Sequence, residues 1–208
     1  MDTDELWRRI HHNRAVLADQ LETLTPAEWE TPSLCAGWTV RDVAAHVISS
    51  SAAGFGEVMT AMARARFNFN RCMDDMAKRR SARPTEEIIA DYRRLAGSRR
   101  RPPGTSRFDP LVDVLIHTQD IVRPLGRRQP MPDLDALAVA GYVWGKSFPY
   151  GAQRRLRGVR LSATDVDWTV GEGAPVEGPV SALLLLMTGR TASLPELSGA
   201  GVTRLTVS

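Results

Sequence analysis

Apolar residues recur at helical spacing along the chain as far as residue 146. The first such segment, residues 4–24, has leucine or isoleucine at positions 6, 10, 17, 21 and 24, and acidic residues precede them, as the helix dipole favours. Comparable patterns predict helices over residues 40–65, 86–97, 110–122 and 133–146, and residues 68–78 can continue as helix. This part of the chain is therefore predicted to be a helical bundle.

The start of the second helix has a clear sequence signal. Thr39 is a good N-cap, and Asp42, three residues later, completes a variant of the capping box. The helix that follows is rich in small residues, so a neighbouring helix can approach its backbone closely.

The pattern changes after about residue 150. Polar and apolar residues alternate over residues 157–170 and 201–208, which predicts strands, and glycine-rich turns separate them. A helix is predicted over residues 179–189. We therefore predict a mainly α protein with two domains: a helical bundle over 1–150 and a small α+β domain over 151–208, with an antiparallel sheet and one covering helix.

Composition and charge narrow the class of protein. The 208 residues suffice for a core without disulfides, and the net charge of +3 does not by itself call for nucleic acid. Cys35 and Cys72 match no zinc-finger spacing, which favours two reduced thiols. The N-terminal segment has no apolar stretch of the signal-peptide type, and the apolar run 182–187 is too short to span a membrane. A cytoplasmic protein is the expectation.

Two histidines lie within apolar helical segments, where an imidazole needs a hydrogen-bond partner or a metal ion. They are His46 and His117, and Asp113 precedes His117 by four residues, on the same face of the helix. Two histidines and one carboxylate leave coordination positions of a divalent ion open, as catalytic sites do. Spacing alone leaves two interpretations: a metal site, or histidines that are hydrogen-bonded in the core. Asp120 has three possible roles: it is a metal ligand, a residue that orients His117, or a helix-end residue that binds backbone amides.

Three stretches of the chain resemble a known family. Residues 24–47, LTPAEWETPSLCAGWTVRDVAAHV, resemble the opening signature of the mycothiol-dependent maleylpyruvate isomerase family, within the wider DinB-like group of helical bundles. Residues 113–126, DVLIHTQDIVRPLG, are similar to its second metal-binding helix. SATDVDWTVGEG and SALLLLMTGR resemble its small C-terminal domain.

The resemblance implies a DinB-like four-helix bundle with a metal ion, usually zinc, held by His46, Asp113 and His117. The isomerases have glutamate where this chain has Asp113. The shorter aspartate side chain must therefore approach the ion more closely, bind it through a water molecule, or no longer act as a ligand. Arg190 matches an arginine that faces the active site in the family, and a guanidinium there can clamp a substrate carboxylate. Trp38 is expected to border the pocket for the thiol cofactor.

The implied activity is metal-dependent and uses a low-molecular-weight thiol, mycothiol. A metal-bound thiol loses its proton, and the thiolate attacks a small electrophilic substrate, giving isomerisation or S-transfer. The family signature is shared by members with different reactions, so it selects no substrate.

Two other classes of function have some support in the sequence. A non-catalytic metal- or thiol-binding module, or sensor, of the same fold is the alternative, motivated by the aspartate at position 113. Nucleic-acid binding through the five arginines between Arg93 and Arg101 is not favoured, because no helix-turn-helix, RRM or zinc-finger pattern accompanies them. The expected partners are a small thiol and an electrophile, and the sequence gives no oligomeric state.

Overall fold

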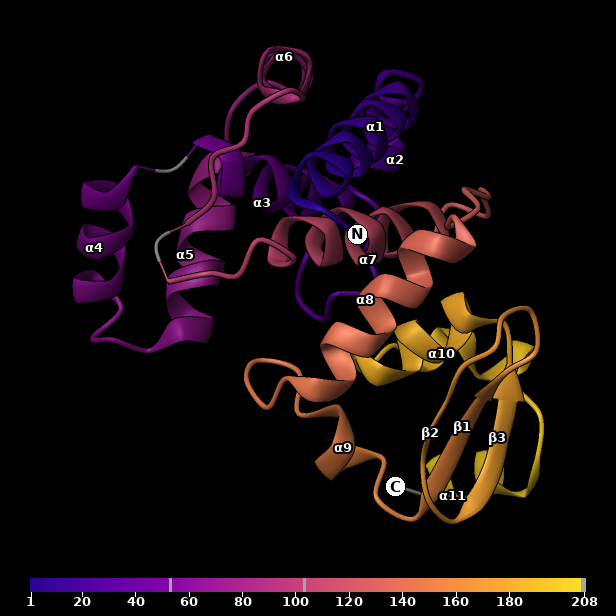
Figure 1. Ribbon diagram of the computed structural model, residues 1–208. Coiled ribbons are helices and arrows are strands. Elements are labelled where there is room, and N and C mark those ends of the chain that lie inside the picture. Colours follow the sequence, from indigo (N-terminus) through magenta and orange to yellow (C-terminus); the bar gives the residue numbers. More distant parts are fainter. Residues whose placement is uncertain (53, 103, 207–208) are drawn as a thin grey trace. The chain divides into compact units, whose positions relative to one another are not determined.

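A computed structural model describes residues 1–52, 54–102 and 104–206 of the chain (Figure 1). These residues form two compact units, Met1–Gln129 and Pro130–Ser208. Among the described residues, no helix is both long enough and apolar enough to cross a membrane.

The named elements of the first unit are all helices. It contains α1 (Thr3–Glu22), α2 (Pro26–Trp29), α3 (Val40–Ala52), α4 (Phe55–Arg64), α5 (Phe69–Ser81), α6 (Thr85–Leu95) and α7 (Asp109–Val122). Helices α1, α3, α6 and α7 form a four-helix bundle, in which α1 and α3 each pack against both α6 and α7. The apolar stripes that predict these helices supply the core, with fully buried side chains that include Leu6, Ile10, Leu17, Val43, Ile88 and Leu111. The predicted mainly helical fold is confirmed.

The N-terminus of α3 is fixed by the predicted capping pair. The backbone N–H of Thr39 donates to Asp42 Oδ2 over 2.9 Å, and the N–H of Asp42 donates to Thr39 Oγ1 over 3.3 Å. Asp42 also accepts from Lys78 Nζ at 2.5 Å and from Ser81 Oγ at 2.6 Å, both on α5. This buried network sets the position of the helix that carries His46.

The single helix predicted over residues 40–65 is instead two helices. Gly54 has an extended backbone and serves as the N-cap of α4, so the helical path does not continue from α3. Helix α4 packs against α5, and α5 packs against α3 (Figure 1). Between α4 and α5 lies a separate small core of Ala61, Ala65, Cys72 and Met76. The apolar residues of this segment therefore serve a second core rather than extending the bundle.

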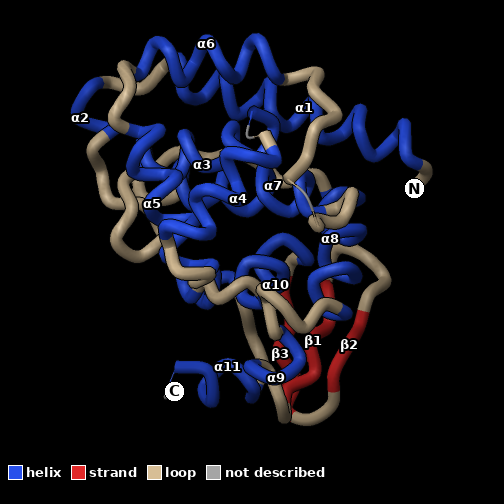
Figure 2. Tube along the Cα trace, turned by 90° about the vertical axis from the view of Figure 1, so that its left-hand side faces the viewer, coloured by secondary structure: helices blue, strands red, loops and turns tan. Residues whose placement is uncertain are grey.

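The second unit is a small α+β structure. It contains α8 (Asp133–Gly145), α9 (Ala152–Arg155), β1 (Val159–Ala163), β2 (Thr169–Gly171), β3 (Ala174–Gly178), α10 (Val180–Met187), the 3-10 helix η1 (Thr191–Glu196) and α11 (Ala200–Thr206). The strands lie side by side in the order β2-β1-β3 (Figure 2). The almost wholly buried α10 packs against α8, η1 and the sheet.

Two predictions for this unit are wrong in detail. The sheet is mixed, because β1 pairs antiparallel with β2 but parallel with β3. The segment predicted as a strand over 201–208 forms α11 as far as Thr206, and its last two residues lie outside the described part. This helix packs on β3 so closely that a Cβ at Gly201 would lie 2.5 Å from Val176 Cγ2. The close packing of this segment on β3 thus outweighs its alternating pattern of polar and apolar residues.

The boundary between the units also differs in place from the predicted one at 150. Helix α8 precedes residue 150, yet it packs against α10 of the second unit. Its buried face is made of small residues and valines, including Ala136, Val139, Ala140 and Val143. These side chains lie on the helix that packs against the leucine-rich α10, and they belong to the core of the second unit.

Candidate metal centre

Helices α3 and α7 bring together the three residues that the sequence predicts as metal ligands. His46 comes from the middle of α3, and Asp113 and His117 lie one turn apart on α7. The ligand atoms of the three side chains all lie within 4.8 Å of one another. The rings of His46 and His117 meet edge to face, with centroids 5.0 Å apart.

The spacing of these atoms suits a metal ion better than a hydrogen bond. Asp113 Oδ1 lies 3.7 Å from His46 Nε2 and 3.5 Å from His117 Nε2. Both separations exceed the usual hydrogen-bond length. Two atoms bound tetrahedrally to zinc at about 2.0–2.1 Å are about 3.3–3.4 Å apart. Two nitrogens and one carboxylate oxygen are also ligands that zinc accepts, so the residues present fit the ion that the family resemblance implies.

The centre is partly exposed to solvent, and its charged groups shift the pKa of Asp113. The side chains of His46, His117 and Asp113 are 19%, 13% and 27% exposed, so solvent reaches each of the three residues. Burial raises the pKa of Asp113, but His46 first and then His117 and Arg14 outweigh it and hold that pKa below its usual value. The carboxylate is therefore available as an anionic ligand.

The second nitrogen of His117 faces a different pair of residues. Nδ1 lies 2.8 Å from Asp120 Oδ2, and Cys35 Sγ lies 3.1 Å from the same oxygen and 3.7 Å from Nδ1. Cys35, His117 and Asp120 also bring three ligand atoms within 4.8 Å of one another. Here, however, the carboxylate is in hydrogen-bonding distance of both partners, unlike Asp113.

One buried residue beside the centre, Arg14, is absent from the sequence prediction. Arg14, on α1, is 1% exposed; its Nη1 donates to the carbonyl of Ser98 over 2.8 Å, and its Nη2 has no hydrogen-bond partner among the described residues. Burial lowers the pKa of Arg14, and Asp113 and Tyr92 act in the opposite direction. The sequence signal was present, since position 14 follows Ile10 by four residues on the apolar face of α1.

The two other predicted functional residues, Trp38 and Arg190, lie outside the helices that carry these ligands. Trp38 precedes α3, and its ring centroid lies 5.1 Å from that of His46. Arg190 belongs to the second unit, where it immediately precedes η1, and its Nη1 donates to the carbonyl of Thr188 over 2.7 Å. Its role remains a prediction.

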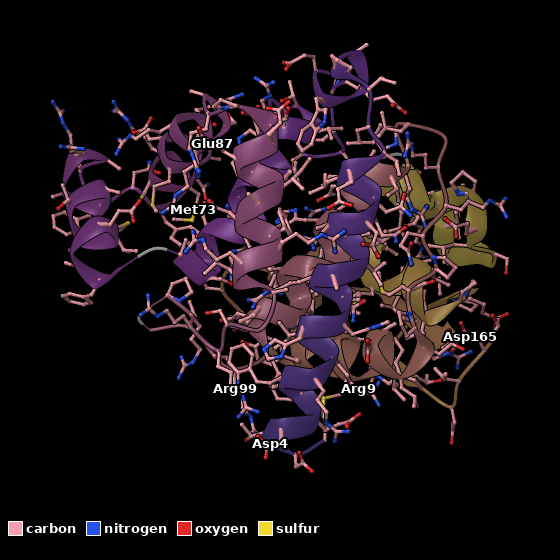
Figure 3. The ribbon with its side chains drawn as sticks, turned by 90° about the horizontal axis from the view of Figure 1, so that it is seen from above. Asp4, Arg9, Met73, Glu87, Arg99 and Asp165 are labelled. Atoms are coloured by element: carbon pink, nitrogen blue, oxygen red, sulfur yellow. The ribbon has the colours of Figure 1, made fainter. Side chains whose placement is uncertain are left out.

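The arginine cluster considered for nucleic acid is largely engaged in ion pairs. Arg93 pairs with Asp19 and Glu22 at 2.6 and 2.7 Å. Arg99 pairs with Asp4 at 2.8 Å, and the two side chains lie at the same end of α1 (Figure 3). The positive charges of Arg93 and Arg99 are thus offset by acidic side chains within the first unit.

The fold and the centre define a class of protein: a four-helix bundle with two histidines and a carboxylate between its helices, joined to a small α+β unit. Residues 10–122, more than half of the chain, match the family model of the mycothiol maleylpyruvate isomerase N-terminal domain. The chain belongs to this family.

Solved structures agree with this assignment. A crystal structure of the mycothiol-dependent maleylpyruvate isomerase matches with a TM-score of 0.68 at 15% identity, covering 96% of this chain and 93% of that one. A histidine-to-alanine variant of that enzyme matches with the same TM-score and coverage at 14% identity. At such identities the likeness shows a shared fold. No protein of curated function has a matching sequence.

Proposed function

We propose that this protein is a metal-dependent enzyme that uses mycothiol for isomerisation or S-transfer on a small electrophilic substrate. The observation that carries the proposal is the placement of His46, Asp113 and His117, whose ligand atoms face one another at separations suited to a divalent ion. Membership of a mycothiol-dependent family supports the choice of thiol.

Each residue of the centre has a distinct task in this proposal. The Nε2 atoms of His46 and His117 and the carboxylate of Asp113 would hold the ion, with zinc as the expected metal. When bound, the ion supplies Lewis acidity that lowers the pKa of a coordinated thiol and so produces the nucleophile. The three side chains are partly exposed to solvent, which is consistent with access of that thiol to the centre.

Arg190 and Trp38 complete the proposal on the strength of the family resemblance. We propose that the Arg190 guanidinium binds a carboxylate of the substrate in bidentate fashion. Trp38 would border the thiol cofactor, which is consistent with its contact with the His46 ring. Arg190→Lys keeps the charge but loses the planar fork, so it should raise KM by about tenfold or more in steady-state kinetics.

The alternative is a non-catalytic module of the same fold that binds metal or thiol. Its motivation is Asp113, one methylene shorter than the glutamate of the isomerases. The observed separations of 3.5 and 3.7 Å from the two histidine nitrogens favour a carboxylate that still reaches the ion. Metal binding alone does not separate the two functions, so the test needs a second step.

The first step of the test is elemental analysis of protein purified without a histidine tag. We expect about one zinc ion per chain, and loss of it in His46→Ala, His117→Ala and Asp113→Asn. His12→Ala is the matched control, because His12 is an exposed histidine of α1. A wild-type protein that takes up no zinc on incubation would contradict the proposed chemistry.

The second step is turnover. The zinc-loaded protein is incubated with mycothiol and a panel of electrophiles that includes activated cis-alkenes and alkyl halides. Product that requires both zinc and thiol, and that is lost in His117→Ala, supports the enzyme. Zinc and thiol binding without product across the panel would favour the non-catalytic module.

A further inference from the structure

One short turn contacts the residues around both candidate metal-binding histidines. Residues 33–38, here called the 33–38 turn, lead from α2 into α3. Cys35 of this turn lies against Asp120 and His117, and Trp38 lies against His46. Trp38 is proposed above to border the thiol cofactor, but Cys35, Ala36 and Gly37 of this turn have no task in the proposed chemistry.

The conformation of the turn is closely specified by its own backbone. The N–H of Ser33 donates to the carbonyl of Trp38 over 2.9 Å, and Pro32 and Thr39 form a bridge just outside this pair. Ser33 Oγ accepts from the N–H of Cys35 over 3.1 Å. Gly37 has a φ of +80°, a left-handed conformation that glycine adopts readily. The side chains of Cys35 and Trp38 are therefore presented by a hairpin-like loop of fixed shape.

On one side, the turn is attached to the helix that carries His117. The N–H of Leu34 donates to the backbone carbonyl of Asp120 over 3.2 Å. Cys35 Sγ donates to Asp120 Oδ2 over 3.1 Å, and His117 Nδ1 lies 2.8 Å from the same oxygen. The Asp120 side chain is fully buried. An ionised carboxylate only accepts hydrogen bonds, so each of the two groups at Oδ2 has to act as a donor to bond with it.

This arrangement favours one of the two neutral tautomers of His117. A neutral imidazole has one N–H, and the oxygen 2.8 Å from Nδ1 favours placing it there. Nε2 then keeps its lone pair and points to the side where Asp113 and His46 lie. In this tautomer, Nδ1 on the Cys35 side of the ring orients the imidazole through its hydrogen bond, and Nε2 on the opposite side is the atom that can bind the metal.

On the other side, the turn is attached to α5 and touches His46. Trp38 Nε1 donates to Asp74 Oδ1 over 2.8 Å, and Lys78 Nζ donates to the carbonyl of Gly37 over 3.0 Å. The indole is therefore held from behind while its ring lies 5.1 Å from the His46 ring, inclined at 59°. Rotation of His46 about its side-chain bonds would have to displace an anchored tryptophan.

We propose that the 33–38 turn is a positioning element for both metal-binding histidines: Cys35, acting through Asp120, orients His117, and Trp38 orients His46. Cys35 is thereby a hydrogen-bond donor, neither a ligand nor a nucleophile. The inference rests on the metal-binding part of the proposed function. It does not depend on mycothiol or on any substrate.

The first test reads the tautomer of His117 in the metal-free protein by long-range ¹H–¹⁵N NMR. The wild type should show His117 predominantly as the Nδ1–H form. Asp120→Asn, and to a smaller extent Cys35→Ala, should shift it toward a mixture, and Cys35→Ser should restore the wild-type signal because serine also donates. Cys72→Ala is the matched control, since Cys72 is buried in the α4–α5 core. A predominantly Nε2–H His117 in the wild type would overturn the proposal.

The second test uses Co²⁺ as a spectroscopic substitute for zinc. Loss of a partner that orients a metal-binding histidine typically weakens metal binding by about 10–100-fold, which is the expectation for Asp120→Asn. Cys35→Ala should weaken it by about fivefold, the value of one ordinary hydrogen bond, with rescue in Cys35→Ser. Unchanged affinity in both Asp120→Asn and Cys35→Ala would overturn the positioning role.

The same spectra decide whether Cys35 is itself a ligand. A thiolate bound to Co²⁺ gives a near-ultraviolet charge-transfer band, and we expect none in the wild-type protein. Such a band, lost in Cys35→Ala and not in Cys72→Ala, would place the metal on the Cys35 side and overturn the assignment. A protein that binds Co²⁺ as expected but turns over no substrate would contradict the proposed enzyme and leave this inference standing.

For Trp38, the matched pair is Trp38→Phe and Trp38→Leu. Phenylalanine keeps an aromatic ring beside His46 but loses the bond to Asp74, whereas leucine loses both. We expect Co²⁺ affinity to fall in the order wild type, Trp38→Phe, Trp38→Leu. Equal affinity in all three would contradict the role of the indole.

Discussion

The phenolic hydroxyl of Tyr92 donates to the backbone carbonyl of Ala44 over 2.9 Å, and so connects α6 to α3 two residues before His46. Tyr92 is fully buried, and burial raises the pKa of its hydroxyl, so the group remains a neutral donor. One hydrogen bond between two bundle helices thus contributes directly to the position of a candidate metal ligand.

Tyr92→Phe tests the worth of this bond. The substitution keeps the ring and removes only the donor, so the free energy of unfolding should fall by about 1 kcal/mol. Urea denaturation of the metal-free protein measures the change. A variant as stable as the wild type would show that water or another donor replaces the hydroxyl.

Arg14→Met tests the buried guanidinium. A buried charge replaced by an apolar side chain of similar size is often neutral or stabilising, so we expect stability within about 1 kcal/mol of the wild type or above it. Zinc should bind more tightly, because Arg14 is a positive charge that acts electrostatically on Asp113. Chelator competition measures the affinity, and weaker zinc binding would show that Arg14 supports the centre through its contact with Ser98.

Asp42→Asn tests the network that caps α3. Burial raises the pKa of Asp42, but bonds from Lys78, Ser81 and Thr39 outweigh it and lower the pKa below the usual 3.8. The stabilisation is therefore fully present above this value and is lost as pH falls through the folded-state pKa. We expect the variant to be less stable by about 1–3 kcal/mol at pH 7.

The difference between Asp42→Asn and the wild type should shrink as the pH falls below 3.8. Unfolding curves at pH 7, 5 and 3 would reveal this. A difference that stays constant across the three would mean that the side chain acts by shape rather than by charge.

The two cysteines should differ in accessibility. Cys72 is fully buried, and its pKa is raised by burial and by Asp75, whereas Cys35 is half-buried. An alkylating reagent at neutral pH should leave Cys72 unmodified until the protein unfolds. Mass spectrometry of native and urea-treated samples counts the labels, and labelling of Cys72 in the native protein would indicate that α4 opens readily from α5.

The sequence was most informative where one pattern has one structural outcome. The helical spacing of leucines predicts the bundle, and the four-residue spacing of Asp113 and His117 predicts that they share a face. Arg14 was missed because a charged residue within an apolar stripe does not reveal whether its head is buried. Burial there depends on α6 and α7, which pack against α1.

The strands were harder to predict because their pattern is short. The segment 174–178 contains a proline and a glycine, which indicate a turn, yet it pairs along its length with β1. A strand whose partner is fixed by the rest of the unit needs little propensity of its own. The interaction of Cys35 with Asp120 is equally non-local, since it joins a loop before α3 to the end of α7.

The candidate ligands come from two helices that are far apart in sequence, so an unfolded chain holds no preassembled centre. A metal ion that binds only the folded bundle at 100 times its dissociation constant adds about 2.7 kcal/mol to its stability. Chains that remain empty would unfold more often and be cleaved sooner by proteases. The cellular supply of the ion would then set the lifetime of the protein, and its abundance would follow metal availability without any change in synthesis.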